Sequence, residues 1–270
     1  MEYKEFLKSI QASILDYLPP EYQGASVEVS KFAKVNKQMD GLVIHREGED
    51  ASPILYMEQY YEWGGMGVPT VGHPFEEVCK KIAGDYLHAS EHVGEVYRGI
   101  DKNFIKNNLF LKAVNASLNG TLINSAPHLR IHDLAMLPYS DLGDAGTVLI
   151  THAFAEQLKM SGEQVVAEAI KKNPQNMPLM IKSLDAIVRE IASGMEDIND
   201  RQMEPSSIEV YVLSNEAGTY GASLIANKEV LDYASTIIGG DFYILPSSVH
   251  EVLLAKTGFF PEEELKAMVM

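Results

Sequence analysis

The sequence predicts an α+β protein with a mixed, largely antiparallel sheet and flanking helices. Short β-branched or aromatic segments, bounded by Gly, Pro, Asn or Asp, alternate with segments whose apolar residues recur at helical spacing. Residues 136–158 and 211–234 also share the order strand, acidic glycine turn, strand, helix. This single internal similarity favours a sheet built from two similar halves.

The length and composition favour one compact α+β unit over residues 1–270. The chain has 270 residues and is 46% hydrophobic, so it can bury one large core or two modest cores. Two lobes, residues 1–95 and 96–270, are the alternative organisation.

The first 95 residues are expected to place two helices around a group of strands. Apolar residues at helical spacing predict a helix over residues 3–18, which two prolines then end. Three short segments are expected to form an antiparallel stretch, at residues 27–35, 40–46 and 52–62. After a glycine- and proline-rich connection at 63–74, an apolar stripe predicts a second helix over residues 75–87.

The rest of the chain is expected to alternate strands and helices. Strands are expected at residues 108–117, 132–140, 145–152, 208–215, 220–227, 242–246 and 250–256. Helical segments are expected at residues 121–125, from Ser161 to a stop at Asn173-Pro174, at 181–192, at 228–238 and after Pro261. Residues 194–207 are polar and rich in turn residues, which predicts a loop.

Two of these helices carry cap signals. Ser161 and Gln164 have the spacing of a capping box. Asn227 is an expected N-cap, and Gly239 with Gly240 provides a C-terminal stop. These residues therefore predict where the two helices begin and where the second one ends.

The charge and the cysteine content exclude several classes of partner. The formal charge is −16, from 38 acidic and 22 basic residues, and it would repel phosphate backbones and anionic lipid surfaces. We therefore expect no nucleic-acid partner and no membrane partner. The start of the sequence lacks a secretory signal, no stretch reaches the roughly 18 apolar residues of a membrane span, and Cys79 is the one cysteine. These features predict a cytoplasmic protein without cysteine-rich zinc sites.

Residues 88–92, HASEH, match the HxxEH pattern of a zinc peptidase. In that pattern two histidines one helical turn apart bind the metal and the glutamate activates water. His88, Glu91 and His92 are therefore candidate zinc-site residues. At about 100° per residue, however, they fall on the side of the helix opposite the apolar stripe, and a third protein ligand is needed. A polar helix end is the preferred interpretation.

The segment FYILPSSVHEVLLAK, residues 242–256, holds a second group of candidate catalytic residues. Ser247, Ser248, His250 and Glu251 lie within five positions and would supply a nucleophile and a base. Such partners usually come from separate segments, and the flanking residues alternate as strands do. The preferred interpretation is a tight turn between two strands, in which a serine bonds nearby backbone.

Glycine-rich motifs provide no cofactor site. WGGMG lacks the spacing of a dinucleotide loop, GxxxxGK[ST] is absent from the sequence, and GAS at 221–223 is not a hydrolase elbow. We therefore expect no cofactor.

The C-terminal third resembles the end of a bacterial family that is catalogued only as a domain of unknown function. The resemblance rests on a YVLSN strand, a glycine turn, a GAS segment, a helix and the motif FYILPSSVHE, in this order. It extends more weakly through DGLVIHR, SPILYMEQYYE, FEEVCKKI and PHLRIHDLAML, and HASEH lies outside it. It implies a soluble bacterial protein of α+β type, and it implies no activity, cofactor or catalytic residue.

The sequence thus favours a binding or regulatory module for an unknown small molecule or protein. The alternative is a hydrolase, either zinc-dependent through residues 88–92 or serine- and histidine-based at residues 247–250. A structural subunit that associates through a sheet edge is a third hypothesis, and it predicts a stable oligomer.

Overall fold

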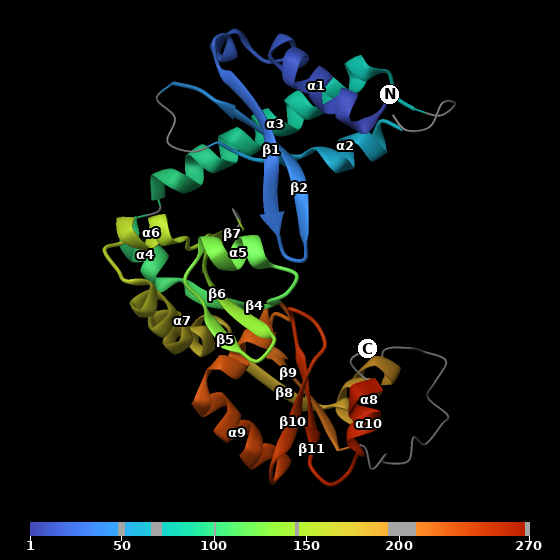
Figure 1. Cartoon of the computed structure of the whole chain (residues 1–270), viewed down its shortest axis with the longest axis vertical. Helices are drawn as coiled ribbons and strands as arrows, with labels where there is room; N and C mark the ends of the chain where they lie inside the picture. The colour runs from blue at the N-terminus through green and yellow to red at the C-terminus, as the bar shows by residue number, and fades with distance from the viewer. Residues whose placement is uncertain (48–51, 66–71, 100, 144–145, 194–208, 268–270) are drawn as a thin grey trace. The chain divides into compact units, whose positions relative to one another are not determined.

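The chain forms an α+β fold, as expected (Figure 1). The computed structural model describes residues 1–47, 52–65, 72–99, 101–143, 146–193 and 209–267. Every strand pair found within these ranges is antiparallel. The chain divides into two compact units, Met1–Asp101 with Leu142–Gly146, and Lys102–Asp141 with Thr147–Met270. Each unit is described by itself.

Unit 1 combines a three-stranded sheet with helices. Its elements are α1 (Tyr3–Ser13), the 3-10 helices η1 (Ile14–Tyr17) and η2 (Pro20–Tyr22), β1 (Ser26–Lys34), β2 (Lys37–His45), β3 (Leu55–Tyr56), α2 (Met57–Trp63) and α3 (Phe75–Gly99). The strand order is β1-β2-β3, and β1 and β2 form a hairpin with Ser26 opposite His45. The expected first helix is confirmed, although its last turn is a 3-10 helix.

The third strand is much shorter than expected. Residues 52–62 were expected to be extended, but only Leu55 and Tyr56 pair with β2, and Met57–Trp63 is helical. Met57 and Tyr60 are both buried, and their three-residue spacing puts them on one face of a helix. The aromatic composition of this segment therefore suggests a strand, whereas its buried positions follow the helical period.

The predicted stripe on the second helix forms much of the core of unit 1. Val78, Cys79, Ile82 and Tyr86 on α3 are buried against residues from α1, β2 and α2. Tyr86 also donates a hydrogen bond to the Ile44 carbonyl at 2.8 Å, which ties α3 to β2 and satisfies the buried hydroxyl. Burial raises the pKa of the Cys79 thiol to about 11, so this cysteine is a core residue with little thiolate character.

The described residues of unit 2 form two four-stranded sheets. The elements of the first half are α4 (Lys102–Asn107), β4 (Leu109–Asn115), α5 (Gly120–Ser125), β5 (Leu129–Ile131), β6 (Leu134–Asp141), β7 (Thr147–Leu149), α6 (His152–Gln157) and α7 (Gly162–Asn176). The strands β4, β5, β6 and β7 form the first sheet. In it β6 is central and pairs with the other three strands. The helix α7 packs against β4 (Figure 1).

The second sheet of unit 2 has the order β10-β11-β9-β8. The elements are β8 (Leu179–Ser183), α8 (Leu184–Ser193), β9 (Val210–Asn215), the 3-10 helix η5 (Gly221–Ala226), α9 (Lys228–Ile238), β10 (Phe242–Pro246), β11 (Val252–Lys256) and α10 (Glu262–Ala267). The expected hairpin of β10 and β11 and the final helix are confirmed. The expected loop at 194–207 lies outside the described residues.

Both cap predictions are confirmed. Ser161 and Gln164 form the capping box of α7, with each side chain bonded to the backbone of the other residue. The Asn227 side chain accepts from two backbone amides at the start of α9, and Gly239 ends that helix with a φ of 73°. These ends depend on neighbouring residues alone, which is why the sequence predicts them well.

The expected helix stop at Asn173-Pro174 is wrong. The helix α7 continues to Asn176 with Pro174 inside it. Proline removes the amide that would bond the Ile170 carbonyl, and the Asn227 side-chain amide donates to that carbonyl instead, at 3.4 Å. A residue far along the chain thus replaces the missing donor.

The expected helix at 181–192 begins later than predicted. Residues 179–183 pair with β9 as the edge strand β8, and the helix starts at Leu184. The Ser183 hydroxyl accepts from the Ala186 amide at 3.2 Å, so Ser183 has the role of an N-cap. A serine directly before Leu184 is thus the local sequence signal for the start of α8.

The strand expected at 220–227 is wrong, because Gly221–Ala226 forms the 3-10 helix η5. Tyr220 adopts a φ of 60°, which turns the chain back onto the end of β9. A Cβ atom at Gly221 would lie 2.5 Å from the backbone nitrogen of Asn215, so only glycine permits this close approach. The internal similarity between residues 136–158 and 211–234 therefore does not extend to this segment, where the first copy has the strand β7 and the second has a 3-10 helix.

Candidate functional site

The predicted zinc residues lie within α3, which continues to Gly99, so the expectation that this helix ends near residue 87 is wrong. His88 and Glu91 are exposed, whereas the side chain of His92 lies outside the described part of the chain. Within the described residues there is no group of three His, Cys, Asp or Glu side chains that could hold a metal ion. The zinc site at residues 88–92 stays a prediction.

The predicted serine and histidine residues form the turn between β10 and β11. The Ser248 hydroxyl accepts from the His250 backbone amide at 2.9 Å, and the Ser248 amide donates to the Glu251 carbonyl at 3.2 Å. Both of these hydrogen bonds of Ser248 go to backbone groups of its own turn, which is the arrangement of a serine that stabilises a turn.

The ring of His250 contacts the loop before η5. Its Nδ1 accepts from the Tyr220 backbone amide at 3.2 Å, and the two rings lie 5.6 Å apart. The backbone carbonyl of His250 accepts from the Ser214 hydroxyl at 2.8 Å. These contacts join the turn to β9 and η5. A catalytic role for Ser248, His250 and Glu251 stays a prediction.

A buried lysine lies beside Tyr220. The Lys112 side chain on β4 is 6% exposed, and its Nζ donates to the Thr147 hydroxyl at 2.8 Å. The same Nζ lies 3.9 Å from the Tyr220 ring centroid and 4.1 Å from that of Tyr139, within cation–π range. Sequence reasoning missed this cluster, although a lysine inside an apolar strand was a visible signal.

A separate hollow of about 710 Å³ is lined by α4, by α7 and by the connection between α6 and α7. Its charged lining residues are Lys106, Lys159, Lys171, Lys172 and Glu168. The described lining residues thus include four of the chain's 22 basic residues but only one of its 38 acidic residues. We call this site the lysine hollow. It is a local reversal of the charge of the whole chain.

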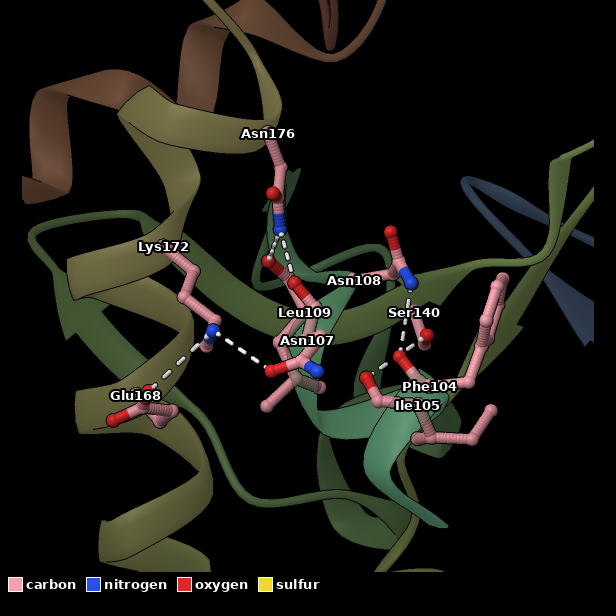
Figure 2. A network of polar contacts seen from close by, with 9 residues as sticks. All are labelled: Phe104, Ile105, Asn107, Asn108, Leu109, Ser140, Glu168, Lys172 and Asn176. Carbon is pink, nitrogen blue, oxygen red and sulfur yellow. Dashed lines mark hydrogen bonds and ion pairs between the residues drawn. The ribbon is translucent and has the colours of Figure 1, made fainter. Parts of the chain in front are cut away.

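The wall of the lysine hollow at the end of α4 is held by side-chain hydrogen bonds. The Asn176 amide on α7 donates to the carbonyls of Asn107 at 3.0 Å and Leu109 at 2.9 Å. The Ser140 hydroxyl on β6 donates to the Ile105 carbonyl at 3.1 Å. The last carbonyls of a helix lack partners within it, and here β6 and α7 supply them (Figure 2). The α4 wall is therefore fixed to α7 and β6.

Lys172 is the most tightly held cation of the hollow. Its Nζ donates to the Asn107 side-chain oxygen at 3.3 Å and lies 3.8 Å from a carboxylate oxygen of Glu168 (Figure 2). Its side chain is 19% exposed, so the ammonium is partly desolvated. A 3.8 Å ion pair is a long one, and it leaves the ammonium able to bond a second, incoming anion.

Lys159 reaches the hollow from a strained backbone position. It follows α6 with a φ of 58°, in the left-handed region, and its amide bonds the Glu156 carbonyl. Helices usually end with glycine in this conformation, because a side chain there costs energy. A lysine at such a position therefore has a conformational cost that glycine would avoid.

None of the four lysines was singled out from the sequence. They come from α4, from the connection before α7 and from α7, so only the fold brings them together. In the described residues, no helix is long and apolar enough to span a bilayer.

The fold and the hollow define an α+β protein that carries a basic, polar hollow in its second unit. The model of a family of unknown function, DUF5688, matches residues 3–270. The chain belongs to this family, and the expected resemblance is confirmed. No curated protein and no solved structure matches the chain.

Proposed function

We propose that this protein is a binding module for a small anionic ligand and that the lysine hollow binds the ligand. The observation that carries the proposal is the charge reversal, because four lysines and one glutamate line a hollow in a chain of net charge −16. Grouping like charges costs free energy through repulsion, and a bound anion offsets that cost.

The size and the framework of the hollow support a small ligand. A volume of about 710 Å³ lies within the usual range of small-molecule sites. The bonds from Asn176 and Ser140 hold α4 in place before any ligand arrives, which lowers the ordering cost of binding. A nucleic acid would extend beyond the hollow and meet the acidic remainder of the surface.

The proposed setting is the bacterial cytoplasm. The buried thiol of Cys79 makes no disulfide, which suits a reducing compartment. A cytoplasmic location also gives access to phosphorylated and carboxylated metabolites, the commonest small anions that a lysine cluster would bind.

Calorimetric titration of the full chain with inorganic phosphate and with citrate tests the proposal. We expect binding at low ionic strength that weakens as salt screens the lysines. The double variant Lys106→Gln/Lys171→Gln removes two exposed or half-exposed cations of the hollow and should weaken binding at least about tenfold. Both side chains lie at the surface, so the fold should persist, which circular dichroism would verify.

The matched control is Lys228→Gln, an exposed lysine of α9 outside the hollow. It removes one positive charge from the same unit, against two in the hollow variant, and we expect anion binding within about twofold of the unaltered chain. If the control weakened binding as much as the hollow variant, or if neither anion bound the unaltered chain, the proposal would be wrong.

A further inference from the structure

We infer that the ligand of the lysine hollow is a phosphorylated sugar or polyol, rather than a nucleotide or a polycarboxylate. This inference rests on the proposed function and specifies its ligand class. It is carried by the kinds of side chain that line the hollow, taken together with their number and position.

The cations of the hollow suit a phosphate group. All four are lysines, and no arginine lies among the described lining residues. Arginine binds carboxylate and phosphate alike through a planar pair of donors, whereas lysine acts as a point charge and is a common ligand of phosphate groups. Four such charges, contributed by α4, by the connection before α7 and by α7, exceed what a single carboxylate would need.

The uncharged polar residues of the hollow suit hydroxyl groups. Three carboxamides line it: Asn103, Asn107 and Gln164. A carboxamide both donates and accepts, as a hydroxyl does, so the two pair in either direction. The oxygen of Gln164 accepts from the Ser161 amide in the capping box, which orients this side chain at the start of α7.

Glu168 discriminates against a ligand that carries only negative charge. Its carboxylate lies 3.8 Å from the ammonium of Lys172, at the same wall of the hollow. It would repel a polycarboxylate placed there, but it accepts hydrogen bonds from hydroxyl groups. A ligand with a phosphate near the lysines and hydroxyls near Glu168 avoids this repulsion and donates hydrogen bonds to the carboxylate.

The apolar lining offers no platform for a nucleobase. Met160 and Ala167 are the apolar side chains among the described lining residues, and none of those residues is aromatic. Proteins usually bind bases by stacking them on aromatic rings or between apolar side chains. A sugar or polyol phosphate has no such requirement.

A panel of four probes tests the ligand class by calorimetry on the full chain: inorganic phosphate, glucose 6-phosphate, adenosine monophosphate and citrate. We expect glucose 6-phosphate to bind at least about tenfold more tightly than inorganic phosphate, because two or more hydroxyl hydrogen bonds are added. Adenosine monophosphate should bind more weakly than glucose 6-phosphate, because it offers only two ribose hydroxyls and its base finds no stacking partner.

The variant Glu168→Gln provides a specificity readout. It should raise the affinity for inorganic phosphate and for citrate by a few fold, because a repulsive charge is removed. It should also reduce the preference for glucose 6-phosphate over phosphate, because a neutral amide accepts more weakly than a carboxylate. The matched control is Glu163→Gln, because Glu163 is an exposed residue of the same helix that does not line the hollow. In this control the affinities for phosphate and citrate and the preference for glucose 6-phosphate should stay unchanged.

The failures of the two proposals are distinguishable. Equal affinity for glucose 6-phosphate and phosphate, or tighter binding of adenosine monophosphate or citrate, overturns the ligand class while the hollow remains an anion site. Absence of binding by all four probes overturns the proposed function itself. If Lys106→Gln/Lys171→Gln fails to fold, the single variant Lys171→Gln takes its place, because Lys171 is exposed on α7.

Discussion

Lys159 combines a left-handed backbone conformation with a place in the lining of the proposed anion site. Its φ of 58° is a conformation that costs a side chain about 1 kcal/mol relative to glycine. We therefore expect Lys159→Gly to raise the free energy of unfolding by up to about 1 kcal/mol while it weakens binding of anions to the hollow. Urea denaturation and calorimetric titration measure the two effects on the same protein.

The control for this prediction is Lys159→Ala. Alanine lacks the charge but keeps the Cβ atom, so it should weaken anion binding as glycine does without the gain in stability. If alanine and glycine changed the unfolding free energy equally, the strain at Lys159 would not be the cause.

Tyr139 should make the protein sensitive to alkaline pH. Burial, followed by the proximity of Tyr220, raises the pKa of the Tyr139 hydroxyl from an ordinary value of 10.0 to about 12. The folded state thus holds this proton more tightly than the unfolded state does. The corresponding stabilisation is complete below about pH 10 and is lost as the pH rises towards 12, by at most about 2 to 3 kcal/mol.

Urea denaturation between about pH 9 and pH 12 measures this loss. The variant Tyr139→Phe removes the titrating group, so its unfolding free energy should fall less steeply over the same range. Tyr243→Phe removes an exposed hydroxyl of β10 and is the matched control. An unchanged slope in Tyr139→Phe would contradict the assignment.

At the scale of elements, Asn227 connects two helices. Its side-chain oxygen accepts from the amides of Glu229 at 2.8 Å and Val230 at 3.4 Å, and its amide donates to the Ile170 carbonyl that Pro174 leaves without a partner. Asn227→Ala removes all of these bonds and should lower the free energy of unfolding by about 1 to 2 kcal/mol. Thermal or urea unfolding provides the measurement.

Two further variants separate the two functions of Asn227. Asn227→Asp keeps the acceptor and loses the donor, so it should cost less than Asn227→Ala. Pro174→Ala restores a backbone donor for the Ile170 carbonyl, and in that background Asn227→Asp should cost almost nothing. A cost that is the same in both backgrounds would mean that the contact between Asn227 and α7 has no energetic role.

The elements that the sequence predicts well are those whose boundaries depend on neighbouring residues. The capping box at Ser161 and the caps at Asn227 and Gly239 are of this kind. The helix at Met57–Trp63 and the 3-10 helix at Gly221–Ala226 are not, because their composition resembles that of strands. Contacts with distant residues decide these segments, and tertiary packing commonly overrides local propensity in this way.

At the scale of the whole molecule, the net charge conceals the candidate site. The value of −16 argues against anionic partners in general, and it leads to the expectation, from the sequence alone, of no nucleic-acid or membrane partner. Lys106 and Lys171 are 65 positions apart, and no local pattern relates them. The charge reversal of the lysine hollow arises only when α4, the connection before α7 and α7 come together.

The division of the chain predicts that unit 1 folds alone. A core cluster that includes Phe6, Ile10, Leu42 and Tyr86 is contributed entirely by residues within Met1–Asp101. A fragment of residues 1–101 should therefore unfold cooperatively in urea. Ile10→Ala, at a fully buried position, should lower its stability by about 2 to 5 kcal/mol, whereas Lys8→Gln, at an exposed position of α1, should change it little. A fragment without a cooperative transition, or one in which both variants behave alike, would show that this core needs the rest of the chain.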